Sequence, residues 1–380
     1  MTSLDNARNL ILTSVSPVEP ERIALLDAGG RVASEDILAP VPLPPVRIAA
    51  VEGFLCREDD MAPHGILMES PVDPAVEPLA VSPGDIVPPD AAAIVRAPGS
   101  YPAGEGEGIV EAGMLATSDE VIIPRGTNLS AMDVRLLAEL GTRRVPVHRK
   151  PRIAVVAIGD ELARLDDTLG PGKRYDGASP MLAAYVGACG GIPVQLGPVP
   201  RNPEDIEFAM SKAFDEDDAL ILVAASGAVH SDDLAQILAK KGVDQRFLGV
   251  ALHPGCASFF GMARGMPVLL VSSAAADLLV TSELLIAPLV QKLTGVPVGE
   301  PRKVGAMMEQ TLRGTAGVCA VWAIELKTEG RALIARPVKG WPGGVVFSAA
   351  SVHGLCISSD GRDVRAGYSA EVIPVRAGFR

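Results

Sequence analysis

The segment Ile153–Ile158 constrains the fold of this chain more than any other. Its sequence, I-A-V-V-A-I, is a run of consecutive apolar residues that ends at Gly159-Asp160. Such a run is typical of a strand buried on both faces, as in parallel sheets that helices cover on both sides. Helix and strand patterns then alternate, which predicts a doubly wound α/β domain. The elements expected after this strand are helices at 180–188, 203–214, 232–240 and 275–293, and strands at 194–196, 219–223 and 268–271.

Smaller pieces are predicted on either side of the α/β domain. A helix capped by Ser3 and a short helix over Glu21–Leu26 precede A-P-V-P-L-P-P (39–45), whose prolines favour an extended strap. Short β-prone runs between Gly- and Pro-rich turns fill 46–123. The tail from Lys303 also alternates as strands, with no helical signal.

The chain of 380 residues is long enough for several domains. A further helix, capped by Ser130 and stopped by Gly141, separates the β-prone region from the α/β domain. The predicted fold class is therefore α/β plus β. The predicted parts are a helix and strap domain (1–45 with 124–150), an all-β insert (46–123), the α/β domain (151–296) and a small C-terminal β domain (297–380).

Charge and cysteine usage limit the classes of partner and compartment. There are 34 Lys and Arg against 46 Asp and Glu, a net charge of −12, which argues against binding to nucleic acid or to an acidic membrane. The longest apolar run, 274–290, is interrupted by Asp277 and Glu283, so we expect no membrane span. Five scattered cysteines without a C-x-x-C pair predict free thiols, and no leader precedes the first helix. Together these features predict a cytoplasmic protein.

Candidate ligand residues follow the predicted strands, because ligands bind at the carboxyl ends of the strands in open α/β sheets. Asp160 follows the first strand, and acidic residues there suit Mg²⁺, a ribose hydroxyl or a pterin amide. Asp176 and Ser179 come just before a predicted helix and could equally be loop and cap residues.

Two further strand ends carry small and polar residues. Ser226 and Gly227 lie in a turn whose amides could cradle a phosphate, with Asp232 opening the next helix. Ser272 and Ser273 enter the last helix, where hydroxyls are more often caps than ligands.

Histidine and cysteine occur together in His253-Pro254-Gly255-Cys256. A metal or nucleophile site here would need a partner, for which His230 is the candidate, and the pattern favours a turn. A second pair, His353 and Cys356, has no partner in the sequence.

Five segments, in order, resemble the MoeA family, the molybdopterin molybdenumtransferases to which the gephyrin E domain belongs. They are P-E-R-I-A-L-L-D-A-G-G-R-V-A-S-E-D-I (20–37) with L-P-P (43–45), I-P-R-G-T-N-L-S-A-M-D-V-R-L-L-A-E-L-G (123–141), R-K-P-R-I-A-V-V-A-I-G-D-E-L (149–162), Y-D-G-A-S (175–179), and G-L-C-I with R-A-G-Y-S-A-E-V-I-P in the tail (354–374). The resemblance implies a MogA-like α/β domain. It also implies ligation of molybdate to the dithiolene of adenylylated molybdopterin, release of AMP, assistance by Mg²⁺, and a homodimer.

The resemblance further implies roles for individual residues. Asp160 in G-D-E-L, Asp232, and Glu52 in V-E-G-F would be the catalytic carboxylates that bind the cation or molybdate. The residues that would contact the pterin nucleotide are Asp176, Ser179, Ser226, Gly227, His253, Gly255, Ser272 and Ser273.

The chain departs from the family pattern in its phosphate-binding segments. The family's T-S-G-G-x-S-x-G is L-V-A-A-S-G-A-V (222–229), so Ala224 and Ala225 replace two glycines and their Cβ atoms would hinder positive φ and close phosphate approach. The family's K-P-G-K-P is H-P-G-C-A, so His253 and Cys256 replace two lysines. The family's L-P-G-N-P is V-S-S-A-A (271–275).

Two hypotheses follow from these matches and departures. The first is an enzyme of molybdenum cofactor assembly. The second is a non-catalytic family member that keeps a dimeric scaffold and binds a protein partner, a cofactor intermediate or another pterin. Residues 151–296 contain 5 Lys and 6 Arg against 17 Asp and Glu, including D-E-D-D at 215–218, and this acidity counts against a phosphorylated anion.

Overall fold

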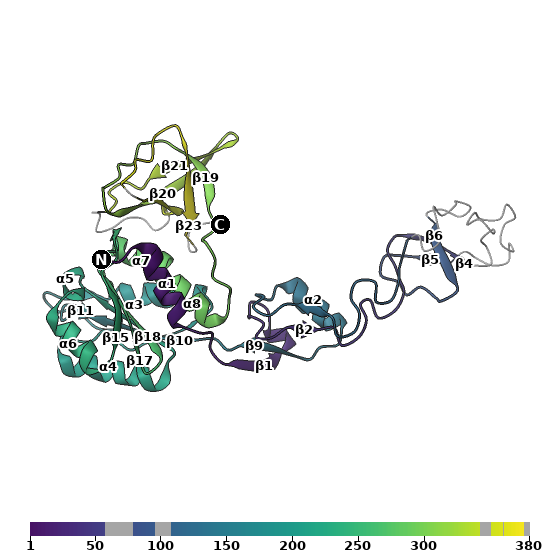
Figure 1. Cartoon of the computed structure of the whole chain (residues 1–380), viewed down its shortest axis with the longest axis horizontal. Helices are drawn as coiled ribbons and strands as arrows, with labels where there is room; N and C mark the ends of the chain where they lie inside the picture. The colour runs from purple at the N-terminus through teal and green to yellow at the C-terminus, as the bar shows by residue number, and fades with distance from the viewer. Residues whose placement is uncertain (58–78, 96–107, 343–350, 360, 376–380) are drawn as a thin grey trace. The chain divides into compact units, whose positions relative to one another are not determined.

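The computed structural model of the chain describes residues 1–57, 79–95, 108–342, 351–359 and 361–375 (Figure 1). Two compact units divide the chain: Met1–Glu21 with His148–Arg380 form the first, and Arg22–Val147 form the second. The unit borders fall inside the predicted helix and strap domain (1–45 with 124–150), and the four predicted domains stay a prediction. In the described part of the chain, no helix is long and apolar enough to cross a membrane.

A six-stranded sheet with the order β13-β10-β14-β18-β17-β15 forms the centre of the first unit (Figure 1). The parallel strands are β13 (Ile192–Gln195), β10 (Arg152–Ile158), β14 (Ala219–Ala224) and β18 (Met266–Ser272). Two antiparallel strands, β17 (Ser258–Ala263) and β15 (Asp244–Leu248), extend the sheet at one edge. The predicted doubly wound fold is confirmed, with these two strands added to it.

Helices cover both faces of this sheet because alternate residues of each strand point to opposite sides. Ile153 and Val155 are fully buried in one core cluster, which also contains residues of α1 (Leu4–Ser14), α3 (Ala178–Ala188) and the helical stretch 275–294. Ala154 and Val156 are fully buried in the other, with α4 (Pro203–Glu216) and α6 (Asp232–Lys240). The continuous apolar run therefore reflects burial on both faces, as the sequence predicts.

The predicted helix at 275–293 has three segments. These are α7 (Ala275–Thr281), a π-helical turn η3 (Ser282–Ile286) and α8 (Ala287–Thr294). Gly295 ends α8 in the left-handed region with φ +87°, a conformation that favours glycine.

The C-terminal region is a closed five-stranded barrel. Its strands are β19 (Val304–Met308), β20 (Cys319–Glu329), β21 (Ala332–Pro337), β22 (Gly354–Ser358) and β23 (Ser369–Pro374). The barrel closes because β20 pairs with both β21 and β22. A short strand from the α/β part, β16 (Leu252–His253), pairs with Cys319 and Ala320 of β20. The predicted small C-terminal β domain is thus confirmed.

The second unit holds short strands and one helix, as expected for 46–123 and 130–140. Its strands include β2 (Ile37–Leu38), β3 (Ile48–Ala49), β4 (Gly53–Arg57), β5 (Ala80–Val81), β6 (Ala91–Val95), β7 (Ile109–Val110) and β8 (Val121–Ile123). Helix α2 (Ala131–Glu139) begins at the predicted cap, since Ser130 and Asp133 form a reciprocal capping box. The strap at 39–45 contains no helix, and its Leu43 forms a β-bridge with Ala116.

The predicted short helix over Glu21–Leu26 is wrong. Residues Pro20–Ala24 form strand β1, which pairs with β9 (Arg144–His148), and a single 3₁₀ turn, η1 (Leu25–Asp27), follows. The helix was expected because Ile23, Leu25 and Leu26 share a helical spacing, but Leu26 is 91% exposed. Pairing with β9 satisfies the backbone groups of this segment, so it needs no helical hydrogen bonds.

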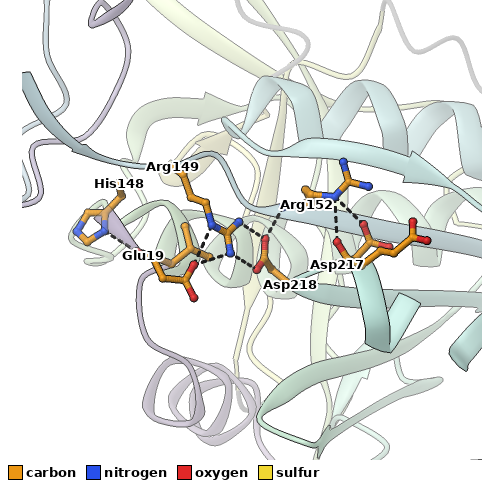
Figure 2. A network of polar contacts seen from close by, with 8 residues as sticks. Glu19, His148, Arg149, Arg152, Asp217 and Asp218 are labelled. Atoms are coloured by element: carbon orange, nitrogen blue, oxygen red, sulfur yellow. Dashed lines mark hydrogen bonds and ion pairs between the residues drawn. The ribbon is translucent and has the colours of Figure 1, made fainter. Parts of the chain in front are cut away.

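A network of ion pairs lies at the edge of the sheet where β10 and β14 begin (Figure 2). Arg149 donates two hydrogen bonds to the Asp218 carboxylate, each 2.6 Å long, and a third of 2.8 Å to Glu19. The N–H of Arg152 donates to Asp218 at 2.7 Å. The side chain of Asp217 is fully buried and accepts no hydrogen bond from the residues that the structure describes, but its Oδ1 lies 3.2 Å from Nε of Arg152. Asp217 and Asp218 are thus paired with arginines within the fold. The sequence suggested that their negative charge counts against an anionic ligand, but these two charges are compensated.

Burial raises the pKa of Asp217 above its ordinary value, and Arg152 opposes this only in part. Because the folded state disfavours the ionised form, Asp217 lowers the free energy of unfolding once the pH exceeds the unfolded pKa of about 3.9. We therefore expect Asp217→Asn to raise the melting temperature at pH 7 by about 2–4 °C, and the gain to shrink toward pH 4. Thermal unfolding at the two pH values, with Asp215→Asn as the exposed control, measures this. A lower melting temperature at pH 7 would mean that the ion pair with Arg152 outweighs burial.

Candidate functional site

Three parallel strands end in register at the carboxyl edge of the central sheet. Ile158 of β10 lies opposite Ala224 of β14, and Ala224 lies opposite Ser272 of β18. The N–H of Ser273 donates to the carbonyl of Ala224 at 2.7 Å, which holds the next residues side by side. The turns that begin at Gly159, Ala225 and Ser273 therefore start from one row, which we call the strand-end edge.

The strand order places the switch point of this sheet between β10 and β14. From β10 the chain passes through α3 to β13 on one side, and then through α4 to β14 on the other. Connections leave in opposite directions at such a point, which opens a crevice where ligands of open α/β sheets bind. Asp160 and Ser226 lie just beyond the two strands that border this crevice.

Asp160 is exposed at the end of β10 and its contacts orient the surrounding loops. Its Oδ1 accepts a hydrogen bond of 2.9 Å from the N–H of Arg201, and its main-chain carbonyl accepts one from Nζ of Lys173. The neighbouring Glu161 pairs with Arg174 at 3.0 Å. A backbone hydrogen bond and this arginine hold the pKa of Glu161 below its ordinary value. Two carboxylates and three basic residues therefore lie around the first strand end.

Asp176 and Ser179 have structural contacts at the start of α3. Oδ1 of Asp176 accepts hydrogen bonds from the N–H groups of Ala178 at 2.9 Å and Ser179 at 3.1 Å, so the buried carboxylate caps the helix. Oγ of Ser179 is buried and has no hydrogen-bond partner. Of the two alternatives for Asp176, the structure shows the cap. A ligand role would require the same carboxylate to bind both the N–H groups of α3 and the ligand.

The segment Ala224–Gly227 does not need the glycines that the family pattern has. Ala224 is a fully buried residue of β14, and Ala225 has φ −55° and ψ 144°, an extended conformation open to any residue. Neither alanine therefore has the positive φ that a Cβ would hinder. Ser226 and Gly227 are exposed in the short helix α5 (Ser226–Val229). Ala225 is exposed, so its methyl group remains as the sequence argument against close approach of a phosphate.

Ser272 and Ser273 differ in their roles at the third strand end. Ser272 is fully buried, and its Oγ accepts a hydrogen bond of 3.2 Å from the N–H of Ala274, so it acts as a local turn residue. Ser273 is half-buried and follows it at the strand-end edge.

The turn His253–Cys256 lies next to the start of α7. The N–H of Gly255 donates to Oδ1 of Asp277 at 2.8 Å, and Asp277 lies in the first turn of that helix. Ser258, where β17 begins, pairs with Val271 near the end of β18, so the turn lies toward the strand-end edge. His253 is exposed and Cys256 is half-buried. His253 ends β16 and a bend at Pro254 follows, so the segment connects β16 to β17, and its metal or nucleophile alternative stays a prediction.

Two predicted carboxylates do not belong to the strand-end turns. Glu52 is exposed in the second unit, and Asp232 is exposed in the first turn of α6; neither has a hydrogen bond or ion pair from its side chain among the described residues. No three His, Cys, Asp or Glu side chains in the described ranges gather closely enough to bind a metal ion. The described residues thus do not form a metal centre of their own, and we derive no chemical step through Mg²⁺.

Sequence reasoning overlooked the cations around Asp160. Lys173 precedes the short strand β12 (Arg174–Tyr175), Arg174 begins this strand, and Arg201 precedes α4. A local pattern does place Arg201 in the sequence, because Asn202 and Pro203 mark the start of α4 and so put Arg201 at the end of the preceding loop. Their approach to Asp160 depends on chain segments 13 and 41 residues away, which no local pattern records.

Two family models match the chain. Residues 2–141 match the MoeA N-terminal region (domain I and II), and residues 154–292 match the probable molybdopterin binding domain. These segments correspond to the region before the α/β domain and to the α/β domain itself.

Named relatives and solved structures agree with these models. Molybdopterin molybdenumtransferase 1 of Mycobacterium tuberculosis is 26% identical over 360 residues, covering 83% of this chain and 84% of that protein. Molybdopterin molybdenumtransferase of Bacillus subtilis is 27% identical over 303 residues, covering 72% and 70%. The crystal structure of the molybdopterin biosynthesis moeA protein from Pyrococcus horikoshii OT3 has a TM-score of 0.78 and 22% identity, and covers 99% of this chain and 100% of that one. At this identity the structural match establishes the fold.

Proposed function

Since this chain belongs to the MoeA family and is a MoeA-like protein of molybdenum cofactor biosynthesis, we propose that it binds adenylylated molybdopterin at the strand-end edge. There it would transfer molybdate to the dithiolene and release AMP. The observation that carries this proposal is the row of Ile158, Ala224 and Ser272, which brings three ligand turns together at the switch point. Relatives named molybdopterin molybdenumtransferase support the reaction class.

The proposed roles of the strand-end residues follow from their exposure. Ser226 and Gly227 are exposed beside the crevice and would contact a phosphate through hydroxyl and amide groups. Asp160 would be the carboxylate for Mg²⁺, because this ion is commonly held by one or two carboxylates together with substrate phosphates. Glu52 and Asp232 stay proposals as further metal ligands.

A second function, a non-catalytic MoeA-like scaffold, is favoured by one observation. The turn that carries His253 and Cys256 lies toward the strand-end edge, where two lysines of the family pattern are replaced. Each lost charge-assisted hydrogen bond to a phosphate would cost about 1.5–3 kcal/mol. We propose for either function a cytoplasmic homodimer, in line with the resemblance and with the free thiols of Cys256 and Cys356.

Calorimetric titration with adenylylated molybdopterin, followed by a molybdate-dependent assay of AMP release, tests the two functions. Binding followed by AMP release is expected for the enzyme. Binding without release under the same conditions would favour the scaffold that retains the pterin nucleotide. Absence of binding would contradict the enzyme and a scaffold for this pterin nucleotide, and would favour a scaffold that binds a protein partner or another pterin.

The methyl group of Ala225 provides a prediction for the same assay. Ala225→Gly should tighten binding of adenylylated molybdopterin by about threefold, because it removes the exposed Cβ that limits phosphate approach. The backbone there is already extended, so the melting temperature should change little. Weaker binding by the variant would show that the methyl group contributes to the site.

A further inference from the structure

Arg201 is held at the strand-end edge by its backbone. Val199 forms a parallel bridge with Ile158, so the chain after β13 runs alongside the end of β10. The N–H of Arg201 then donates to Oδ1 of Asp160 at 2.9 Å. The start of the Arg201 side chain is therefore fixed next to the residue that follows β10.

The side chain of Arg201 reaches toward the other border of the crevice. Its Nη2 lies 3.9 Å from Oδ2 of Asp233, in the first turn of α6, and α6 follows β14 in the chain. The side chain thus extends from the β13 side of β10 toward an element that follows β14, across the switch point between them. At 3.9 Å the pair is long, and both partners are exposed, 42% for Arg201 and 78% for Asp233. Such a pair is weak, so the guanidinium can exchange Asp233 for another anion.

Lys173 provides a second cation at the same residue. Its Nζ donates to the main-chain carbonyl of Asp160, and a carbonyl leaves the ammonium charge uncompensated. Arg174, in contrast, is paired with Glu161 at 3.0 Å and its charge is compensated. Two cations with weak or neutral partners therefore flank Asp160.

We propose that Arg201 and Lys173 bind the phosphate group of a phosphorylated ligand at the strand-end edge. This inference rests on the proposed function and identifies the cations that would act in place of the two lysines absent from the His253–Cys256 turn. A guanidinium can donate two parallel hydrogen bonds to a phosphate, whereas an ammonium acts as a point charge. The phosphate would displace the Asp233 carboxylate from Arg201.

Titration of the full chain with AMP and with adenylylated molybdopterin tests the inference. Arg201→Ala should weaken binding of both about tenfold to a hundredfold, Arg201→Lys should keep part of the affinity, and Lys173→Ala should also weaken it. Arg246→Ala is the matched control, because Arg246 forms an exposed pair of 3.1 Å with Asp244 on the edge strand β15 and is 45% exposed. This control should bind like the wild type.

Asp233→Ala adds a reading in the opposite direction. Because it releases Arg201 from its only observed pair in the described ranges, it should tighten AMP binding about twofold to threefold. If the wild type binds and both Arg201→Ala and Arg246→Ala bind with the same affinity, the inference is overturned. The proposed function then still stands. A wild-type chain that binds neither compound would overturn both.

Discussion

Replacing Asp218 with alanine is expected to lower the melting temperature of the chain by about 10 °C. Asp218 accepts two hydrogen bonds of 2.6 Å from Arg149 and one of 2.7 Å from the N–H of Arg152. Its side chain is 17% exposed, so water compensates little when these bonds are lost. Removing one partner of such a pair costs about 3–4 kcal/mol, and each kcal/mol corresponds to about 2–4 °C in a domain of this size.

Thermal unfolding of Asp218→Ala next to Asp215→Ala isolates this effect. Asp215 belongs to the same acidic run but is exposed in α4, and no ion pair is found for it among the described residues. Its replacement should change stability by less than about 0.5 kcal/mol. Equal melting temperatures for the two variants would mean that the bonds to Arg149 and Arg152 contribute nothing net.

The parts of the fold that sequence predicts well are those with a local cause. The helix at 232–240 was predicted with the observed bounds, and its causes are local: apolar residues at helical spacing, and the cap that Ser231 forms in the structure. The strand at 153–158 was recognised because both of its faces are buried. Spacing and caps act within one element, so the sequence of that element carries them.

The parts that were missed have a distant cause. β17 pairs with β18 on one side and with β15 on the other, and Gly261 interrupts the apolar run of β17 at a point where a Cβ would lie 2.8 Å from the carbonyl of Asp244. Arg149 and Asp218 are 69 residues apart, and their pairing appears only once β10 and β14 are adjacent. Such contacts have no periodic signal for a single sequence to show.

The candidate site divides along the same line. The sequence predicts that residues after β10, β14 and β18 share an edge, since parallel strands end on one side of a sheet. It does not predict which of them are committed to the fold. Asp176 caps α3 and Ser272 forms a local turn, and both look like ligands in the sequence. Arg201 looks like a loop residue, and only its bond to Asp160 brings it into the site.

Gly255 and Gly227, both expected from the resemblance to contact the pterin nucleotide, should respond to alanine in opposite ways. Gly255 has φ +108°, and a Cβ there would lie 3.1 Å from Leu252 and 3.3 Å from Thr281. Gly255→Ala should therefore cost about 3 kcal/mol from backbone strain and crowding, seen as a melting temperature lower by about 6–12 °C. A Cβ at Gly227 would meet no atom within 4 Å, and the residue lies in a helix, so alanine should be neutral or stabilising there.

The pair of variants separates folding from ligand binding. If Gly227 approaches a phosphate, Gly227→Ala should weaken binding of adenylylated molybdopterin while the melting temperature holds, because the added methyl would meet no protein atom within 4 Å but would hinder the phosphate. Gly255→Ala should lose stability whether or not a ligand is present, since Gly255 fixes the turn between β16 and β17 against α7. A Gly255→Ala chain as stable as the wild type would contradict the strained turn. If the melting temperature of Gly255→Ala were unchanged, contact with the ligand would be the remaining reason for glycine at this position.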